Sequence, residues 1–119
     1  MNYRNLKAYQ MAFSLAVKIH NITKNFPKEE QYSLTDQIRR SSRSVCASIA
    51  EGYRKRRYPK HFINKLSDAD SENSETMVWI EFSEVFKYIN VDFFNELSKE
   101  CSEIGFLLNY MINNPEKFL

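Results

Sequence analysis

The sequence predicts an all-α protein that folds as an antiparallel up-down four-helix bundle, a single domain over residues 1–119. Only two glycines and three prolines occur in the 119 residues, which is too few for the frequent turns of a β-sandwich or barrel. The prolines, at positions 27, 59 and 115, lie where helical patterns would begin or end. Between these points, apolar residues recur three and four positions apart, as on one face of a helix. Short connections between long helices favour antiparallel neighbours.

The first helix is expected at about residues 6–26, and its apolar residues form two stripes. We expect the stripe that contains Leu6, Phe13 and Val17 to face the core. The second stripe would then remain uncovered in a bundle of this size. We therefore expect it to form the interface of a homo-oligomer, through Leu15, Ile19, Ile22 and Phe26.

The second helix is expected at about residues 34–52 and is rich in serine, alanine and cysteine. Small side chains let helix backbones approach closely, so this helix should be tightly packed at the centre of the bundle. Gly52 ends the pattern, as glycine commonly does at a helix C-terminus. Four larger apolar residues should face the core, namely Leu34, Ile38, Val45 and Ile49.

The third and fourth helices are expected at about residues 59–89 and 91–113. Pro59 suits the first position of the third helix, whose C-terminal half, MVWIEFSEVFKYI, is apolar on most of its faces. This surplus is a second indication of contacts between subunits. The fourth helix has one apolar seam with heptad spacing, formed by Phe94, Leu97, Cys101, Ile104, Leu108 and Met111.

Charge is unevenly distributed, although the formal net charge is only +2. Residues 37–65, the basic block, carry nine Lys or Arg and one Asp or Glu, whereas residues 66–119 carry three and eleven. This asymmetry indicates either attraction to a polyanion or pairing of basic and acidic parts within or between subunits.

The densest basic segment is RKRRYPK, residues 54–60, at the junction of the second and third helices. Its side chains should project from one end of the bundle, beside a helix N-terminus that also favours anions. A solvated turn without a partner is the alternative interpretation. Because five basic residues in seven exceed what solubility requires, we expect contacts with phosphates of RNA or DNA. The residues expected to make them are Arg43, Arg54, Lys55, Arg56, Arg57 and Lys60.

Arg39, Arg40 and Glu51 are expected to take part in structural ion pairs. Asp36 and Arg40 have the i,i+4 spacing of a helical pair. Glu51 lies in the apolar stretch SIAEG, where an isolated carboxylate would be costly. We therefore expect an arginine to neutralise it, supplied by Arg54, by another helix or by another subunit.

The sequence contains no catalytic constellation, so we expect a protein that is not an enzyme and needs no cofactor or metal. Neither His20 nor His61 has the Glu-x-x-His spacing of carboxylate-bridged metal sites. Asp68, Glu72 and Glu75 share one helical face. A carboxylate row without histidines is more often solvated, so a metal-dependent enzyme is the remotest alternative.

Composition also bears on the compartment. No window approaches the roughly 18 apolar residues of a membrane span, and residues 1–10 lack the apolar region of a signal peptide. Cys46 and Cys101 are too few for a disulfide scaffold and lie within helical patterns, so they should be buried thiols. We expect a cytoplasmic protein without a membrane partner.

The stretch FPKEEQYSLTDQIRRSSRSVCASIAEGYRKRRYPKHF resembles the signature of a bacterial four-helix-bundle family, the 23S rRNA intervening-sequence proteins. That signature contains FP-x-x-E, Q-[IL]-R-R and S-[IV]-x-x-N-I-A-E-G, followed by basic residues and an aromatic residue. The segments SETMVWIEFSEVFKYI and NNPEKF also look like one branch of the family, so the resemblance spans nearly the whole chain. Ser48 stands where the family usually has Asn. The matching residues are Phe26, Pro27, Glu30, Gln37, Ile38, Arg39, Arg40, Ser44, Val45, Ile49, Ala50, Glu51 and Gly52.

The resemblance implies a ring-shaped homopentamer of four-helix bundles. Related proteins, the accessory variability determinants of diversity-generating retroelements, bind nucleic acid and a reverse transcriptase. We therefore expect a non-enzymatic oligomeric protein that binds RNA or DNA through its basic residues. The alternative is a protein-interaction scaffold, or an accessory subunit of a reverse transcriptase, whose basic block contacts a neighbouring subunit or a partner.

Overall fold

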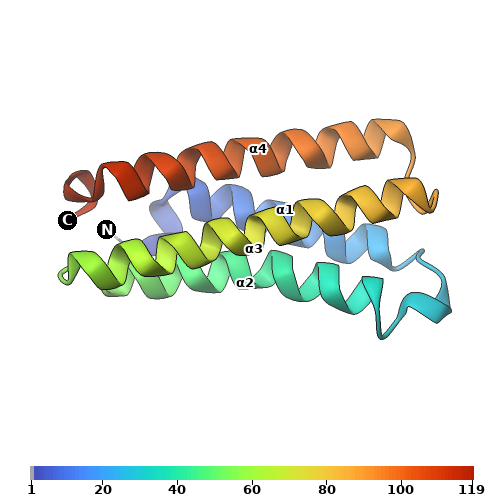
Figure 1. The fold of residues 1–119 in the computed structure, drawn as a ribbon, viewed down its shortest axis with the longest axis horizontal. Coiled ribbons are helices and arrows are strands. Elements are labelled where there is room, and N and C mark those ends of the chain that lie inside the picture. Colours follow the sequence, from blue (N-terminus) through green and yellow to red (C-terminus); the bar gives the residue numbers. More distant parts are fainter. Residues whose placement is uncertain (1) are drawn as a thin grey trace.

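Four α-helices make up most of the molecule in the computed structural model, which describes residues 2–119 (Figure 1). They are α1 (Lys7–Thr23), α2 (Leu34–Arg54), α3 (Pro59–Val85) and α4 (Val91–Asn113). Three short 3-10 helices accompany them, η1 (Tyr3–Asn5), η2 (Lys28–Glu30) and η3 (Pro115–Phe118). No strand occurs between residues 2 and 119. The predicted all-α class and its four helices are therefore confirmed.

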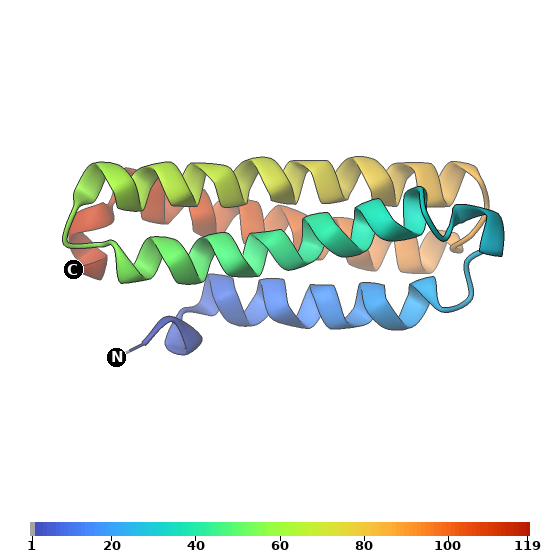
Figure 2. The same ribbon diagram turned by 90° about the horizontal axis from the view of Figure 1, so that it is seen from below.

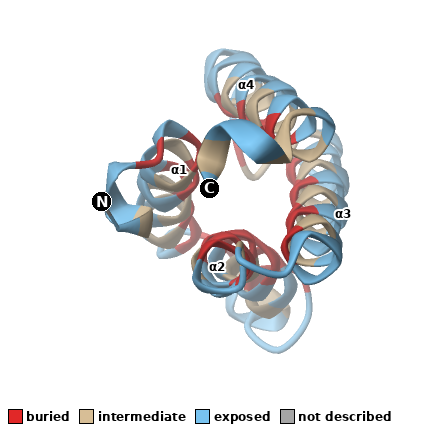
Figure 3. Ribbon diagram, turned by 90° about the vertical axis from the view of Figure 1, so that its left-hand side faces the viewer, coloured by how far each residue is buried: buried red, intermediate tan, exposed pale blue. Residues whose placement is uncertain are grey.

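The four helices run antiparallel along the long axis of the molecule (Figure 1). Each packs against the next one in the chain, and α1 also packs against α4, so the four surround one core (Figure 3). The α2–α3 turn, η1 and η3 lie at one end of the bundle, and the α1–α2 and α3–α4 connections lie at the other (Figure 2). Residues far apart in the sequence are thereby gathered at the two ends.

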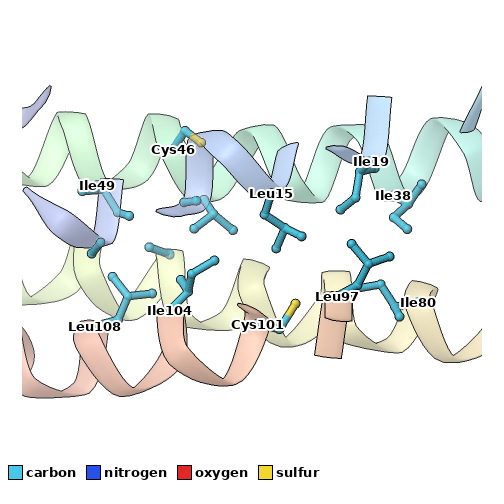
Figure 4. Packing of buried hydrophobic residues seen from close by; sticks show 14 of the residues in the cluster. Leu15, Ile19, Ile38, Cys46, Ile49, Ile80, Leu97, Cys101, Ile104 and Leu108 are labelled. Carbon is cyan, nitrogen blue, oxygen red and sulfur yellow. The ribbon is translucent and has the colours of Figure 1, made fainter. Parts of the chain in front are cut away.

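The core is filled by apolar side chains from all four helices (Figure 4). In α4 the predicted seam faces this core, although Phe94 is only partly buried. The predicted core residues of α2 are buried as well. The confirmed seam residues are Leu97, Cys101, Ile104, Leu108 and Met111, and the confirmed α2 residues are Leu34, Ile38, Val45 and Ile49.

The expectation for the two stripes of α1 is wrong. Leu15, Ile19 and Phe26 are buried in the core of the single chain, and Ile22 packs against that core. They are therefore not the uncovered surface. The exposed stripe is the other one, because Phe13 is 52% and Val17 46% exposed.

The N-terminal end of α1 explains this reversal. Leu6 is buried, as predicted, but it occupies the N-cap position, where its backbone is extended and not helical. Its burial therefore does not turn Phe13 and Val17 inward. Ala8 and Ala12 are also buried, and these small side chains let this face of α1 approach its neighbours closely.

Gly52 lies inside α2, which continues to Arg54, so it is not the predicted helix cap. A Cβ atom built on Gly52 would lie 2.9 Å from Cβ of Lys65 in α3. The missing side chain therefore allows α2 and α3 to approach closely. The predicted tight packing of small α2 side chains is confirmed about three turns earlier in the helix, where the buried Ser41 hydroxyl accepts a 2.8 Å hydrogen bond from Thr76 of α3.

Helix α3 ends at Val85, four residues before the predicted end. Lys87 adopts the left-handed backbone conformation, with φ of 63°. The amide of Tyr88 donates to the carbonyl of Ser83 at 2.8 Å, and that of Lys87 donates to Glu84 at 2.9 Å. These bonds form a Schellman motif with lysine at the position that glycine usually occupies. The absence of a glycine explains why the sequence does not mark this end.

Candidate nucleic-acid interface

The basic turn, residues 54–60, connects α2 to α3 at one end of the bundle (Figure 2). The amide of Lys55 donates to the carbonyl of Gly52 at 2.9 Å, and the amide of Tyr58 donates to Lys55 at 2.8 Å. Pro59 then begins α3. The chain thus reverses within a few residues, which leaves the side chains between the two helices facing outward.

Four of the five cations in the basic turn are exposed, namely Arg54, Lys55, Arg57 and Lys60. Arg56 differs, because its guanidinium lies 3.9 Å from the ring centroid of Tyr53 and donates to the Tyr53 carbonyl at 2.9 Å. Within residues 2–119, none of the five forms an ion pair. The turn is therefore a concentrated, uncompensated positive charge.

Two further features of the basic turn suit an anion. Arg54, Arg56 and Arg57 line a hollow of about 330 Å³ together with Leu119. The first amides of α3 are also open, because Tyr58 supplies no side-chain cap and the first amide bonded to the turn is that of Phe62. Open amides at a helix N-terminus and the helix dipole both favour bound anions.

The two tyrosines near the turn have different environments. Tyr53 is buried, so its ring supports Arg56 and is not available for base stacking. Tyr58 is exposed and lies edge-on to His61, with the ring centroids 6.0 Å apart. Only Tyr58 is accessible to a nucleobase.

Arg43 is not brought to the basic turn. It lies eleven residues before Arg54 on α2, which is roughly 16 Å along a helix. Its guanidinium instead contacts Nδ1 of His20 in α1, with the nitrogens 3.2 Å apart. The structure therefore separates Arg43 from the other residues predicted to bind nucleic acid.

Arg39 has a structural role, but hydrogen bonds provide it. Its Nε donates to the Thr23 hydroxyl at 2.7 Å, and its Nη2 donates to the His20 carbonyl at 3.3 Å. These bonds connect α2 to the end of α1. Arg40 is exposed and, within residues 2–119, forms no ion pair with Asp36.

The expectation that Glu51 is buried and neutralised by arginine is wrong. Glu51 is exposed, and its partner is Lys65 of α3, with the nitrogen and oxygen 3.0 Å apart. This hydrogen bond raises the pKa of Lys65. Glu51 lies on the outer side of the α2–α3 contact, where solvent screens the ion pair and the pair adds little to stability. The apolar neighbours in the sequence occupy other faces of the helix.

The carboxylate row on α3 does not form a metal site. No group of three or more His, Cys, Asp or Glu residues suited to a metal occurs between residues 2 and 119. Glu72 accepts a 2.7 Å hydrogen bond from Ser48 of α2, and burial raises the pKa of Glu72. Ser48, which stands at the Asn position of the family signature, thus contacts α3.

The two cysteines are free and buried, which confirms the prediction of buried thiols. Burial raises the pKa of Cys46 to about 11 and that of Cys101 to about 12. Both thiols are therefore protonated at neutral pH and are poor nucleophiles. Among the helices of residues 2–119, none combines the length and apolar character that a membrane span requires.

Sequence reasoning missed the role of Glu30, a residue of the quoted signature. Its carboxylate accepts hydrogen bonds from the Ser33 hydroxyl at 2.6 Å and the Tyr88 hydroxyl at 2.9 Å. These bonds lower the pKa of Glu30. They join the α1–α2 and α3–α4 connections at the end of the bundle opposite the basic turn. Nothing in the sequence pairs Glu30 with Tyr88, because 58 positions separate them.

Sequence reasoning also missed an apolar groove between α1 and α2, with a volume of about 570 Å³. The α1–α2 groove is lined by Tyr3, Tyr9, Phe13, Ala16, Val17, His20, Arg43, Cys46, Ala47 and Ala50. The signal was present in the stripe of Tyr9, Phe13 and Val17, which recurs every four residues. The helical period alone does not show which of the two stripes of α1 faces the core, so the pattern does not identify this stripe as the exposed one.

Comparison with known proteins places this fold and its signature in a family. The family model described as 23S rRNA-intervening sequence protein matches residues 4–110. A crystal structure of a protein of unknown function from the S23 ribosomal protein family of Bacteroides thetaiotaomicron VPI-5482 has a similar fold, with a TM-score of 0.79 and 29% sequence identity. The match covers 89% of this chain and 95% of that one. No curated protein matches the sequence. The chain belongs to the family of 23S rRNA-intervening sequence proteins.

Proposed function

We propose that this protein is a non-enzymatic, homo-oligomeric nucleic-acid-binding protein that contacts phosphates through its basic turn. The observation that carries the proposal is the set of exposed, unpaired cations at one end of the bundle: Arg54, Lys55, Arg57 and Lys60. Charge held in one turn, without acidic partners, attracts a polyanion. The open amides at the start of α3 lie in the same place.

Phosphate contact accounts for the chemistry of the basic turn better than base recognition does. Arginine and lysine neutralise phosphates without regard to sequence, and reading base edges requires side chains that enter a groove of the duplex. The turn has only one accessible aromatic ring, that of Tyr58. We therefore expect slight sequence preference and strong dependence on salt.

RNA is the first ligand to test. The similar structure from Bacteroides thetaiotaomicron VPI-5482 is described as a member of a ribosomal protein family, and the family of this chain is described by an intervening sequence of 23S rRNA. Neither description states what the proteins bind. Duplex DNA and single-stranded DNA are therefore compared with structured RNA in the same assay.

The proposed oligomer is a pentamer, and it would present several basic turns around one axis. Exposed apolar side chains on three helices support assembly, because large exposed apolar patches commonly mark interfaces. Linked copies of a weak site bind a long polyanion more tightly than a single copy does. These exposed residues include Phe13 and Val17 of α1, Val78 and Phe82 of α3, and Phe106 of α4.

The test replaces Arg54 and Arg57 with alanine and measures affinity against salt concentration by fluorescence anisotropy. Each lost phosphate contact lowers the slope of log affinity against log salt by about 0.9 on duplex DNA and about 0.7 on single strands. For each subunit that contacts the ligand, the double variant should therefore lower the magnitude of this slope by about 1.8 on duplex DNA and by about 1.4 on single strands. Arg56 is left in place because it packs on Tyr53. Its replacement would change the stability of the fold as well as binding, and the two effects could not be told apart.

A matched control removes two exposed cations far from the turn, by Lys28→Ala with Arg40→Ala. The net charge falls equally in both double variants, so a general charge effect would change both slopes alike. The proposal requires that only the Arg54 and Arg57 variant changes. Equal slopes for the two variants, or no binding by the parent at low salt, would refute it.

A further inference from the structure

A second groove lies between α1 and α4 and has a volume of about 480 Å³. Its α1 residues belong to the first turns of that helix, and Phe106 lies in the second half of α4. The α1–α4 groove therefore lies in the half of the bundle that also holds η1, η3 and the basic turn (Figure 2). Two lysines, Lys7 and Lys99, line it together with the ring of Phe106 and the carboxylate of Glu103.

Phe106 is the most unusual residue of this groove, because 73% of it is exposed in the single chain. The core side of α4 is occupied by other residues, among them Ile104 and Leu108. Lys7 and Lys99 are also exposed, and within residues 2–119 neither is in an ion pair. An open aromatic ring with free cations around it is the combination by which proteins hold unpaired nucleotides: the base stacks on the ring and the phosphates meet the cations.

The aromatic surface continues along α4 to η3. Tyr110 follows Phe106 by four residues, so the two are neighbours on the surface of the helix, and Tyr110 is itself 41% exposed. Lys117 of η3 donates to the Tyr110 hydroxyl at 3.0 Å, and its Nζ lies 5.3 Å from the centroid of that ring. Phe118 meets the same ring edge-on, with the centroids 6.2 Å apart. These contacts hold a second lysine-and-ring pair beside the first.

Leu119 connects this surface to the basic turn. It follows Phe118 directly, and it lines the hollow of about 330 Å³ that Arg54, Arg56 and Arg57 form. Phe106 lies seven residues before the end of α4, which is roughly 10 Å along the helix. The cations of the basic turn, the lysine of η3 and the rings of α4 thus follow one another across this end of the bundle. The α4 surface is defined here as Lys7, Lys99, Phe106, Tyr110 and Lys117.

Negative charge on α4 is concentrated away from this end. All four acidic residues of α4 lie within residues 92–103, and Lys18 of α1 pairs with two of them, Glu96 at 3.2 Å and Glu100 at 2.7 Å. No Asp or Glu occurs from residue 104 to residue 115. Glu103 and Glu116 lie beside the α4 surface, against its three lysines. A polyanion can therefore leave the basic turn along α4 without crossing an acidic stretch.

A single strand fits the α4 surface better than a duplex does. Bases in a duplex are stacked on one another, so their faces are covered, whereas unpaired bases can stack on an exposed ring. An acidic protein segment would also meet the lysines. A ligand that crosses both the arginine-lined hollow and two exposed rings, however, needs regularly spaced charges and flat apolar groups, and a nucleic acid strand supplies both.

We propose that the α4 surface carries an unpaired nucleic acid strand away from the basic turn, with one base stacked on Phe106 and a neighbouring base on Tyr110. Lys117 contacts a phosphate between the turn and Tyr110, and Lys7 and Lys99 contact phosphates beside Phe106. This inference rests on the proposed function and adds the form of the ligand, which is single-stranded. RNA and DNA strands offer the same bases and phosphates for these contacts, so the experiment compares the two.

The experiment replaces Phe106 in the full chain and measures affinity by fluorescence anisotropy. The probes are oligouridylate and oligothymidylate of about 12 nucleotides, within the site sizes of single-strand-binding domains, and a blunt RNA duplex. Phe106→Ala and Phe106→Leu should each bind the single strands about 5- to 150-fold more weakly, the range expected for one stacked base. Both should bind the duplex as the parent does. Leucine keeps an apolar side chain without a ring, and Phe106→Trp, which keeps a ring, should bind at least as tightly as the parent.

Salt dependence separates the ring from the lysines. Phe106→Leu should lower affinity without changing the slope of log affinity against log salt, because stacking releases no counterions. Lys99→Ala should reduce the magnitude of that slope by about 0.7 on single strands, and an unchanged slope overturns the phosphate contact of Lys99. Phe93→Ala is the matched control, since it removes an exposed ring near the other end of α4. This control should bind every probe as the parent does.

Unchanged single-strand affinity in both Phe106 variants overturns the inference and leaves the α4 surface to a protein partner. An equal loss for single strands and duplex overturns it as well, because the ring would then not be stacking on unpaired bases. Circular dichroism verifies folding, and if Phe106→Ala is unfolded, Phe106→Leu and Tyr110→Leu carry the test. Light scattering should give the parent mass for each variant; a smaller mass assigns Phe106 to assembly and also overturns the inference.

Failure of this inference is distinguishable from failure of the proposed function. If Arg54 and Arg57 determine the salt slope but the Phe106 variants bind as the parent does, phosphate binding by the basic turn stands and the strand path is refuted. If the Phe106 variants lose single-strand affinity but the Arg54 and Arg57 variant keeps the parent slope, stacking on α4 stands and the basic turn is refuted as the phosphate site. A parent that binds no probe at low salt refutes both.

Discussion

Replacing Gly52 with alanine tests whether the close approach of α2 and α3 depends on a missing side chain. The chain supplies its own control in Gly105, which lies inside α4. An added Cβ at Gly52 would lie 2.9 Å from Cβ of Lys65, an atom attached directly to the α3 backbone. At Gly105 the nearest atom would be Nδ2 of Asn73, at the ordinary contact distance of 3.5 Å.

The two substitutions should change the free energy of unfolding in opposite directions. Alanine is favoured over glycine inside a helix by about 0.8–1 kcal/mol, and Gly105→Ala should gain that amount. Gly52→Ala gains the same free energy from helix propensity, but its added Cβ overlaps Cβ of Lys65 and pushes the backbones of α2 and α3 apart. Overpacking of this kind costs about 1–3 kcal/mol. Gly52→Ala should therefore lower the free energy of unfolding by up to about 2 kcal/mol. The free energies of unfolding of the two variants should differ by about 1–3 kcal/mol.

Urea unfolding followed by circular dichroism measures both changes, at one protein concentration because assembly adds to apparent stability. A loss of about 1 kcal/mol corresponds to a fall in melting temperature of a few degrees for a chain of this size. If both variants were stabilised equally, α2 and α3 would be free to move apart, and Gly52 would not be a packing requirement.

Two further predictions concern single groups. Burial raises the pKa of Glu72, so its ionised form opposes folding, and its contribution is most favourable at acidic pH and is lost as pH rises through the raised pKa. Glu72→Gln, which keeps an acceptor for Ser48, should therefore melt higher than the parent at pH 7 and equally near pH 4; a gain that is the same at both pH values would contradict this. Lys87 has a left-handed φ of 63°, which costs a side-chain-bearing residue about 1–2 kcal/mol, so Lys87→Gly should stabilise the protein by up to about 1 kcal/mol in urea unfolding. Lys55→Gly, at the α2 C-cap with φ of −100°, is the control and should give no gain.

The helices could be predicted because local chemistry marks most of their ends. Pro59 begins α3 at the predicted residue. The side chain of Asn90 accepts from the amide of Phe93 and thereby caps α4. The end of α3 has no such mark, since a lysine occupies the left-handed position there. Where a typical capping residue occupies a boundary, the sequence is sufficient to locate it. Where an atypical residue such as Lys87 takes the capping conformation, the sequence is not.

The orientation of α1 could not be predicted for a different reason. Two apolar stripes satisfy the same helical period, and periodicity alone does not rank them. Leu6, a member of the stripe expected to face the core, is buried, but it lies before the helix begins and does not fix the orientation of Phe13 and Val17. The exposure of Glu51 has a similar cause, because sequence neighbours of a helical residue point to other faces.

The candidate binding residues were predictable where they are adjacent in the chain. A turn of seven residues places its side chains at one end of a bundle whatever the packing elsewhere, so Arg54, Lys55, Arg57 and Lys60 lie together. Arg43 belongs to the same charge block but to a different turn of α2, and it faces α1. A count of charges along the sequence places Arg43 and the basic turn in one block, but the rise of the helix between them puts them at different positions along the bundle.

The residues that carry the family resemblance explain the fold more than the ligand. Phe26 is buried, with its ring 5.3 Å from that of Tyr88, Glu30 bonds Ser33 and Tyr88, and Gly52 allows α3 to approach. Substitutions at these positions should lower the stability of the subunit and should affect binding to a partner only as a consequence. The exposed cations of the basic turn, Arg54, Lys55, Arg57 and Lys60, form no ion pair within residues 2–119. Variants there should therefore separate binding from assembly while the subunit stays folded, which makes them the informative positions for function.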